Sequence, residues 1–296
     1  MEYFVLTVFS DRRVPAHGSG NYLAVFPESG DLTDRQMQRV ANELTTPEGG
    51  RFSETTFVTA ATGDSYEMRI FTPEEELPFA GHPTLGTAWL LRDLGRTSSP
   101  VVAQNSGAGR TRVLEDRGLL WFERGGRADP DLEDEHPSMR ARIAGSIGLD
   151  GHDLNAEARE MGRSGVLRPA VANAGLEMLM VPVRDLKALQ RASPDRARLG
   201  ALPAVGIYAF TAVKAGGLRA RGLFPAVGVP EDPGTGSAAA ALGLYLDRRL
   251  GSVDVEVVQG VEVNRPCRIL VRASDGVVRV GGDCELVARE PLTELP

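Results

Sequence analysis

Two stretches of this 296-residue chain resemble each other in the order of their residues. A shift of 153 residues lays 71–91 on 224–244, and each stretch has a glycine turn followed by an apolar run. The same shift, within one residue, lays SETTFVT (53–59) on VGIYAFT (205–211). Matches that recur in order at one spacing indicate two halves of similar architecture.

Each half contains the same succession of predicted elements: strands, a polar helix, more strands, a glycine turn, an apolar helix and closing strands. Apolar residues at helical spacing predict a helix over 32–44 with Thr33 as its N-cap. The stretches 84–95 and 236–251 are nearly free of charge for several turns, so protein must surround each predicted helix. The pattern predicts an α+β fold in which a curved, mostly antiparallel sheet wraps around one central helix, built twice.

The boundary between the halves is expected where strand signals stop and polar, proline-containing sequence begins, at GGRADPDLEDEHPSMRAR (125–142). We therefore predict two pseudo-symmetric domains, 1–128 and 129–296, with the last strand allowed to return to the first half. A cleft between two domains is a common place for a small ligand. The expected site lies there.

Composition excludes several classes of function. The net charge is −7 and no block of Lys or Arg occurs, so nucleic acid is not an expected partner. No stretch reaches the roughly 18 apolar residues of a membrane span, and the N-terminus lacks a basic leader, so we expect a cytoplasmic protein without a membrane partner. Two cysteines and four histidines offer neither a disulfide framework nor a zinc site, so no metal is expected.

The two glycine turns each precede an apolar helix, in AGHPTLG (80–86) and DPGTGSA (232–238). A helix N-terminus presents unpaired N–H groups and attracts anions. If the halves are related by a repeat, both turns face the cleft and hold an anionic substrate from two sides. A carboxylate fits better than a phosphate, because no P-loop lysine is present. The alternative is that Thr84 and Ser237 only cap their helices.

The blocks SETTFV, TPEEELPFAGHPTLGTA and EDPGTGSA resemble the signature blocks of the PhzF-like family, the phenazine-biosynthesis isomerases. The fold of that family is similar to that of diaminopimelate epimerase. The resemblance runs in order from Met1 to QGVEVNRP (259–266), over most of the chain. It implies an isomerase that needs no cofactor, acts on a small carboxylate and forms a homodimer.

The resemblance also implies roles for individual residues. Glu54 is similar to the family's proton shuttle, whereas His82 and Asp232 are similar to groups that orient the substrate and the proton. It further implies that Ser237 and the Gly236 backbone grip the carboxylate, and we also expect Gly81, Thr84 and Asn21 to bind the substrate. The best-known member of the family acts on trans-2,3-dihydro-3-hydroxyanthranilate.

Physical chemistry supports these roles separately. Moving hydrogen between two carbons of a conjugated system needs a base that removes a weakly acidic proton and an acid that returns it. One glutamate can do both if it reaches both carbons on one face. The alternative is that Glu54 is an ordinary solvated residue at the start of a strand.

The chain departs from the family pattern in three places. The link LTTPEGGRF (44–52) is longer than usual and brings Arg51 near Glu54, where it either grips a second carboxylate or is a solvated loop tip. Tyr22 replaces the usual proline and Asn264 the usual glycine. The substrate is therefore left as a dihydro-hydroxyanthranilate-like compound or an alkyl-proline-precursor diene.

Two rival functions stay open. A family member without activity would only bind a metabolite or a protein partner. An amino-acid epimerase would use a pair of thiols beside the two turns, but those positions are Ala80 and Pro233. Cys267 and Cys284 lie far away in the sequence, so two-thiol chemistry is disfavoured.

Overall fold

The structure is a computed structural model that describes residues 1–15, 17–132, 138–202, 204–214, 216–225 and 229–292. The chain divides into two compact units: unit 1 is Met1–Glu123 with the segment from Gly281 onward, and unit 2 is Arg124–Val280. Both units combine strands and helices, which confirms the predicted α+β class. The domain boundary at residue 128 stays a prediction, and positions 133–137 of the expected linker lie outside the described residues.

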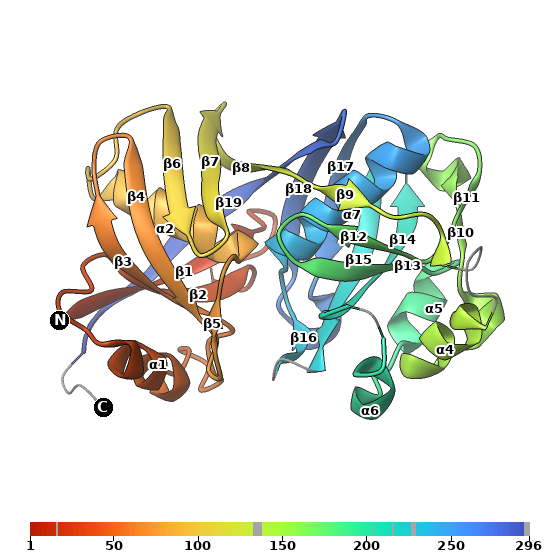
Figure 1. The fold of residues 1–296 in the computed structure, drawn as a ribbon, viewed down its shortest axis with the longest axis horizontal. Helices are drawn as coiled ribbons and strands as arrows, with labels where there is room; N and C mark the ends of the chain where they lie inside the picture. Colours follow the sequence, from red (N-terminus) through yellow and green to blue (C-terminus); the bar gives the residue numbers. More distant parts are fainter. Residues whose placement is uncertain (16, 133–137, 203, 215, 226–228, 293–296) are drawn as a thin grey trace. The chain divides into compact units, whose positions relative to one another are not determined.

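In its described residues, unit 1 contains the helices α1 and α2 and most of the N-terminal strands (Figure 1). In chain order its elements are β1 (Glu2–Ser10), β2 (Asn21–Phe26), α1 (Asp34–Glu43), β3 (Thr55–Ala61), β4 (Ser65–Phe71), β5 (Glu76–Leu77), α2 (Gly81–Asp93), β6 (Val101–Ser106), β7 (Gly109–Asp116), β8 (Leu119–Gly125) and β19 (Val277–Pro291). The end of β8 and the start of β19 belong to unit 2.

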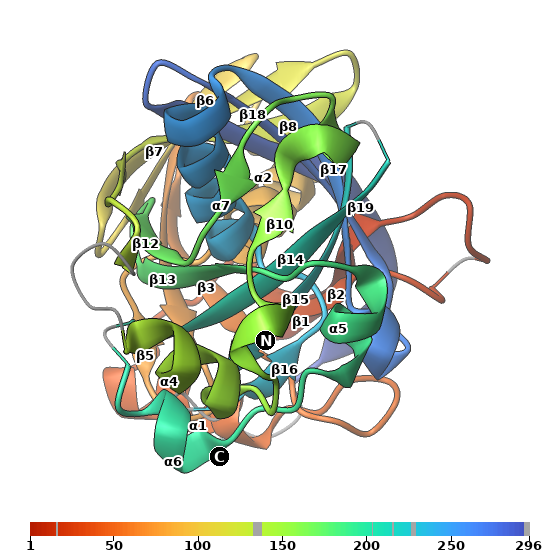
Figure 2. The same cartoon turned by 90° about the vertical axis from the view of Figure 1, so that its right-hand side faces the viewer.

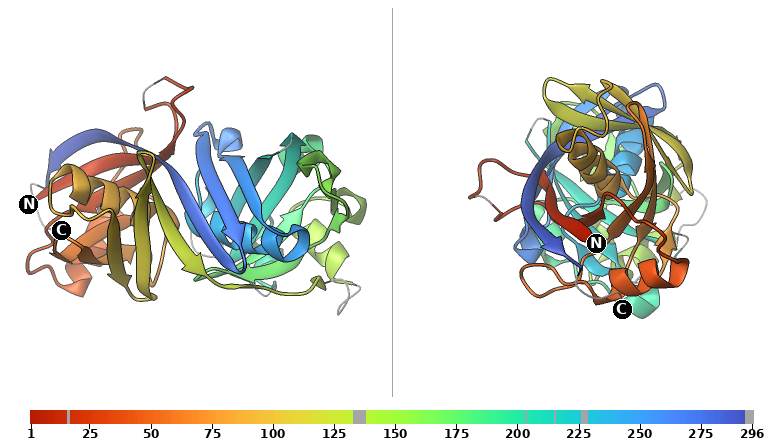
Figure 3. Two further views of the ribbon diagram at one scale, coloured as in Figure 1. Left: turned by 90° about the horizontal axis from the view of Figure 1, so that it is seen from above. Right: turned by 90° about the vertical axis from the view of Figure 1, so that its left-hand side faces the viewer.

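The strands of unit 1 surround α2. Neighbouring strands pair in the order β7, β6, β4, β3, β2, β1 and β19, and β8 pairs with both β19 and β7. The right-hand view of Figure 3 shows α2 enclosed by these strands. Gly86 allows the close approach, because a Cβ there would lie 2.6 Å from Leu23 Cδ2 and 2.7 Å from Val8 Cγ2. The residues Gly81–Ala88 are all buried, as predicted for a helix inside protein.

Helix α1 packs on the outer face of the unit 1 sheet. Thr33 is its N-cap, since Thr33 Oγ1 accepts from the Gln36 N–H and Gln36 Oε1 accepts from the Thr33 N–H. Met37 and Val40 pack in a cluster with aromatic side chains of β2, β3 and β4. The predicted helix and its cap are confirmed, with the helix itself covering Asp34–Glu43.

Unit 2 contains the remaining elements. They are β9 (Arg127–Ala128), α4 (Met139–Ser146), η1 (Gly151–Asp153), β10 (Ala156–Glu157), η2 (Ala158–Met161), β11 (Val166–Leu167), β12 (Ala170–Asn173), β13 (Glu177–Pro182), α5 (Leu186–Arg191), α6 (Arg196–Leu199), β14 (Gly206–Lys214), β15 (Gly217–Phe224), β16 (Val229–Asp232), α7 (Gly236–Leu250), β17 (Val253–Gln259), η4 (Val261–Val263) and β18 (Cys267–Ser274).

The main sheet of unit 2 is covered on both faces. Ile207 and Ala209 of β14 belong to the cluster that packs against α4, α5 and α6. Phe210, which points to the opposite face, stacks edge-on against Tyr245 of α7 with ring centroids 5.7 Å apart. Figure 2 shows α7 on one side of these strands and the short helices on the other. No helix in the described part of the chain is long and apolar enough to cross a membrane.

The two units share one pattern of strand pairing. The pairs β1–β2 and β12–β13 are antiparallel, whereas β2–β3 and β13–β14 are parallel. The pairs β3–β4 and β14–β15 are antiparallel, and the pairs β4–β6 and β15–β17 are parallel. The buried helix follows β5 in unit 1 and β16 in unit 2. This pattern agrees with the internal repeat at a shift of 153 residues.

Candidate functional site

Three predicted site residues meet at one end of the unit 1 sheet. Asn21 begins β2, Glu54 directly precedes β3, and His82 lies in the first turn of α2. Because β2 and β3 are parallel neighbours, their first residues lie at the same end of the sheet. His82 Nε2 lies 3.6 Å from Glu54 Oε2, and His82 Nδ1 lies 3.5 Å from Asn21 Nδ2. Ser53, which was not predicted, donates its hydroxyl to Asn21 Oδ1 over 3.4 Å.

The imidazole of His82 is neutral. Its side chain is 2% exposed, and this burial lowers its pKa to about 3 against the opposing effect of a hydrogen bond with the Tyr22 carbonyl. His82 Nε2 has no hydrogen-bond partner among the described residues, and His82 Nδ1 lies within hydrogen-bond distance of Asn21 Nδ2, so the tautomer sets which ring nitrogen carries the hydrogen. His82 Nε2 faces Glu54 Oε2. Since the ring is uncharged, this contact is not an ion pair.

The buried imidazole makes stability depend on pH. With a folded pKa near 3 and an ordinary value of 6.5, the unfolded state binds the extra proton between these values. The stability that depends on a neutral His82 is fully present above pH 6.5. As the pH drops toward 3, the free energy of unfolding falls by at most about 1.4 kcal/mol per pH unit. Between pH 7 and pH 5, urea denaturation is expected to show the parent losing about 2 kcal/mol more than His82→Gln. Equal losses in the two proteins would contradict a neutral His82.

Three other predicted residues lie around one turn of unit 2. Asp232 ends β16, and Gly236 and Ser237 begin α7. The Thr235 hydroxyl donates to Asp232 Oδ2 over 2.6 Å, and Gln259 Nε2 donates to the Asp232 carbonyl over 2.7 Å. Asp232, Ser237 and Gln259 are all buried. Thr235 and Gln259 were not predicted, and neither was Tyr208, whose hydroxyl donates to Gln259 Oε1 over 2.8 Å.

One signal in the sequence identifies Gln259. Along β17 the buried positions alternate, and they are Val255, Val257 and Gln259. A polar amide on the apolar face of a strand must find partners, because burial of an unpaired amide is costly. Tyr208 and Thr235 carry no comparable signal, since they meet Gln259 only in the folded chain.

The N-termini of α2 and α7 have no side-chain cap. Their N-cap residues are Ala80 and Thr235, and neither side chain bonds the first turn. Thr84 and Ser237 lie inside the helices, so the alternative that they are caps is wrong; Thr84 Oγ1 instead donates to the Ala80 carbonyl over 2.8 Å. The first N–H groups of a helix have no partner within it, so both ends present donors to an anion.

Residues 9–289 match the PhzC-PhzF family, described as phenazine biosynthesis-like protein. The chain belongs to this family. It is 32% identical to trans-2,3-dihydro-3-hydroxyanthranilate isomerase of Pseudomonas aeruginosa over 282 residues, which cover 94% of this chain and 92% of that protein. Named relatives at this level of identity are isomerases, and the PhzF-family protein described here is an isomerase.

Solved structures support the same assignment. A predicted epimerase of Pseudomonas aeruginosa superimposes with a TM-score of 0.75 at 30% identity, covering 99% of each chain. A PhzF-family phenazine biosynthesis protein of Bacillus anthracis superimposes with a TM-score of 0.77 at 22% identity, covering 98% of each chain. The second likeness concerns the fold alone.

The link 44–52 of this PhzF-family protein folds as a small hairpin. Thr45 and Arg51 form an antiparallel bridge, and the Thr46 N–H donates to the Gly50 carbonyl over 2.7 Å. The Tyr22 hydroxyl donates to Glu48 of this hairpin over 3.1 Å. Arg51 is exposed at the base of the hairpin, and its grip on a substrate carboxylate stays a prediction.

Gly260 fixes the chain beside the Asp232 turn. Its φ is +82°, and a Cβ there would lie 2.5 Å from the Pro233 carbonyl oxygen and closer still to that of Arg265. Gly260→Ala is expected to cost about 2–4 kcal/mol of unfolding free energy, from overpacking and left-handed strain together. Gly162→Ala is the matched control, because Gly162 is also in the left-handed conformation, with φ +71°, and a Cβ there would have nothing within 4 Å. Equal losses in the two variants, measured by urea unfolding, would exclude the overpacking.

Three other positions, Asn264, Cys267 and Cys284, were named in the sequence analysis. Asn264 adopts the left-handed conformation with φ 57°, which asparagine tolerates better than most residues. Cys267 is buried and its Sγ lies 3.6 Å from the Arg265 carbonyl oxygen. Burial raises the pKa of the Cys284 thiol, with the negative charges of Asp283 and Glu285 adding to the rise, so it stays protonated. Thiol chemistry is disfavoured here.

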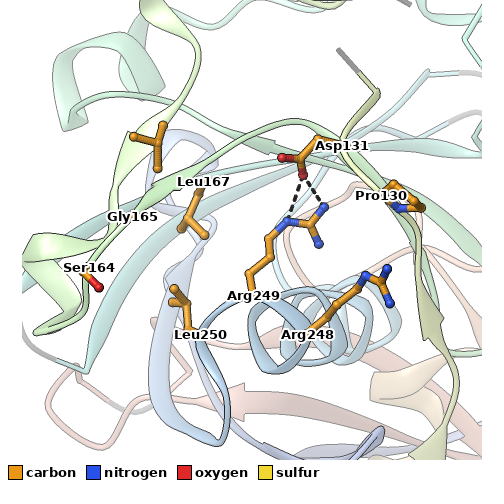
Figure 4. Close-up of a pocket in the computed structure, with 9 residues that line it drawn as sticks. Pro130, Asp131, Ser164, Gly165, Leu167, Arg248, Arg249 and Leu250 are labelled. Carbon is orange, nitrogen blue, oxygen red and sulfur yellow. Dashed lines mark hydrogen bonds and ion pairs between the residues drawn. The ribbon is translucent and has the colours of Figure 1, made fainter. Parts of the chain in front are cut away.

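A separate hollow of unit 2 contains none of the predicted site residues. Its volume is about 290 Å³, and it lies at the C-terminal end of α7 (Figure 4). Arg249 in its wall donates from Nε to Asp131 over 3.1 Å and from Nη2 to the Asp129 carbonyl over 3.1 Å. This guanidinium holds the end of α7 to the segment after β9.

Proposed function

We propose that the protein moves a proton, and with it a double bond, within a small unsaturated amino-acid-like carboxylate. The relative named trans-2,3-dihydro-3-hydroxyanthranilate isomerase makes that compound the first candidate substrate. An alkyl-proline-precursor diene is the second. The proposal uses only side chains and backbone groups of this chain.

The proposal rests mainly on the Glu54 carboxyl lying beside a buried, neutral imidazole. The Glu54 carboxylate takes a proton from a substrate C–H, and the electron pair of that bond spreads over the conjugated system. The resulting carboxylic acid returns the proton to another carbon, so the enzyme ends unchanged. His82 Nε2 lies 3.6 Å away, where it can share a hydrogen bond with the Glu54 carboxyl group.

In this proposal the remaining residues stabilise the negative charge of the substrate and orient it. The uncapped first turns of α2, with Gly81 and Thr84, and of α7, with Gly236 and Ser237, offer backbone donors to a carboxylate. Such donors also stabilise negative charge that develops during proton transfer. Asp232 orients an amine or hydroxyl of the substrate. That the two helix ends act on one substrate molecule stays a prediction.

Turnover in heavy water tests this function. Incubated with trans-2,3-dihydro-3-hydroxyanthranilate in ²H₂O and followed by proton NMR, the protein is expected to shift the double bond. Deuterium should appear at the carbon that receives the proton to the extent that Glu54 exchanges with solvent during the reaction. The diene is tested in parallel as the second candidate. Absence of both isomerisation and isotope exchange with both compounds would contradict the proposal.

A further inference from the structure

The Gln259 amide uses all of its hydrogen-bonding capacity inside unit 2. Its Oε1 accepts from the Tyr208 hydroxyl over 2.8 Å and from the Thr235 N–H over 3.2 Å. Its Nε2 donates to the Asp232 carbonyl over 2.7 Å and to Thr235 Oγ1 over 2.9 Å. Gln259 is 0% exposed, so water does not compete for these bonds. A carbonyl oxygen only accepts, and therefore the side facing Asp232 must be the NH₂ group.

This orientation decides where the Thr235 hydroxyl hydrogen points. Thr235 Oγ1 accepts from Gln259 Nε2, which can only donate, and its own hydrogen is left for Asp232 Oδ2 at 2.6 Å. Hydrogen bonds in series polarise one another, so donation by Gln259 strengthens donation by Thr235. The Asp232 carboxyl is thus held through its side chain by Thr235 and through its backbone by Gln259.

Packing prevents the Thr235 and Gln259 side chains from rotating away from Asp232. A Cβ at Gly222 of β15 would lie 2.7 Å from Thr235 Oγ1 and 2.8 Å from Gln259 Nε2. The two side chains therefore rest directly on the glycine backbone. Tyr208 of β14 is the register partner of Gly222, and its buried hydroxyl donates to Gln259 Oε1. The four side chains come from β14, β16, β17 and the N-cap of α7, so separate elements fix one arrangement.

We infer that Gln259 is a positioning residue that directs the Thr235 hydroxyl onto Asp232 and so holds that carboxyl in one orientation toward the substrate. Tyr208 is the second positioning residue, because it fixes the Gln259 amide. The inference rests on the proposed function only in giving Asp232 a role in catalysis. It deepens that function by naming what sets the orientation of Asp232.

Substitutions at Thr235 test the inference by kinetics. Thr235→Val keeps the size but loses the hydroxyl, and it is expected to lower kcat by about 10–100-fold with KM changed less than about threefold. Thr235→Ser keeps the hydroxyl and should stay within about threefold of the parent. Tyr208→Phe should lower kcat by about 3–10-fold, since Gln259 Oε1 keeps one donor.

Tyr245→Phe is the matched control for Tyr208→Phe. Tyr245 is also a buried tyrosine of unit 2, and its hydroxyl donates to the Arg168 carbonyl over 2.7 Å, away from Asp232. A purely structural effect would lower activity equally in both tyrosine variants. The inference is overturned if Tyr245→Phe loses as much kcat as Tyr208→Phe, or if Thr235→Val keeps the parent kcat.

Hydrogen exchange separates this inference from the proposed function. The Thr235 amide is expected to exchange at least about tenfold faster in Gln259→Met than in the parent, since it loses its acceptor. Tyr245→Phe should leave that rate unchanged. A parent protein that turns over neither candidate substrate contradicts the proposed function. The exchange rates still test whether Gln259 holds Thr235 in place. An unchanged Thr235 rate in folded Gln259→Met overturns the inference.

Discussion

Glu54→Gln is expected to lower kcat for the proposed isomerisation by about 100- to 10,000-fold. Glutamine keeps the size of the side chain beside His82, but it can neither take nor return a proton. KM should change little, because the substitution removes a group needed in the transition state rather than a binding contact. Initial rates and KM, measured on purified protein at pH 7, check this expectation.

Glu67→Gln is the matched control for Glu54→Gln. Glu67 is an exposed glutamate of β4 in the same unit, so the same chemical change there should leave kcat within about twofold. A Glu54→Gln protein with the parent kcat would assign proton transfer to another group. Equal losses in both variants would point to a general effect on folding.

Arg221→Met is expected to cause the largest loss of stability among these substitutions, about 3–5 kcal/mol. Arg221 Nε and Nη2 bond the two oxygens of Glu231 over 2.9 and 2.6 Å. Its Nη1 donates to the carbonyls of Leu189 and Ala192 at the end of α5 over 3.1 and 2.6 Å. Methionine fills similar space but leaves a buried carboxylate and these carbonyls without their donor. Urea unfolding at pH 7 measures the loss.

Two comparisons define this effect. Arg272→Met removes an exposed pair with Asp254, whose side chains are 42% and 72% exposed, and should cost less than about 1 kcal/mol. Arg221→Met combined with Glu231→Leu should cost less than the sum of the single changes, because no carboxylate is then left unpaired. A loss from Arg221→Met no larger than that from Arg272→Met would contradict the importance of this ion pair.

Much of the fold follows from local signals in the sequence. The Thr33 cap, the apolar helices and the alternating strands each carry a pattern that tertiary contacts reinforce. The start of α2 has no such local pattern. The apolar pattern places the first helical residue at Thr84, but the helix begins at Gly81. Pro83 is tolerated there because the first turn needs no N–H partner within the helix.

The short elements between β9 and β12 could not be predicted. Helix α4 covers only eight residues and has no side-chain cap. Ile143 and Ala144 of α4 are held by a cluster with residues of β13 and β14, which are far away in the chain. Helices this short are not stable alone, so their existence depends on tertiary packing.

Part of the candidate site could also be predicted from local sequence, and part could not. Glu54, His82 and Asp232 follow from motifs in continuous sequence, where each block is recognisable alone. The hydrogen bonds around Asp232 join Tyr208 to Gln259, which are separated by 51 residues. Only the pairing of β14 with β15 and of β15 with β17 brings these two positions together. Sequence spacing contains no such information, so the network required the folded structure.

The fate of the transferred proton in Glu54→Gln is the most direct test of the account. Parent and variant are incubated with the candidate substrate in ²H₂O, and product and recovered substrate are compared by NMR and mass spectrometry. The account predicts an isomerised product from the parent, whereas the variant should give neither shifted double bond nor deuterium on carbon. Isomerisation and labelling by the variant at the parent's rate would contradict the role of Glu54.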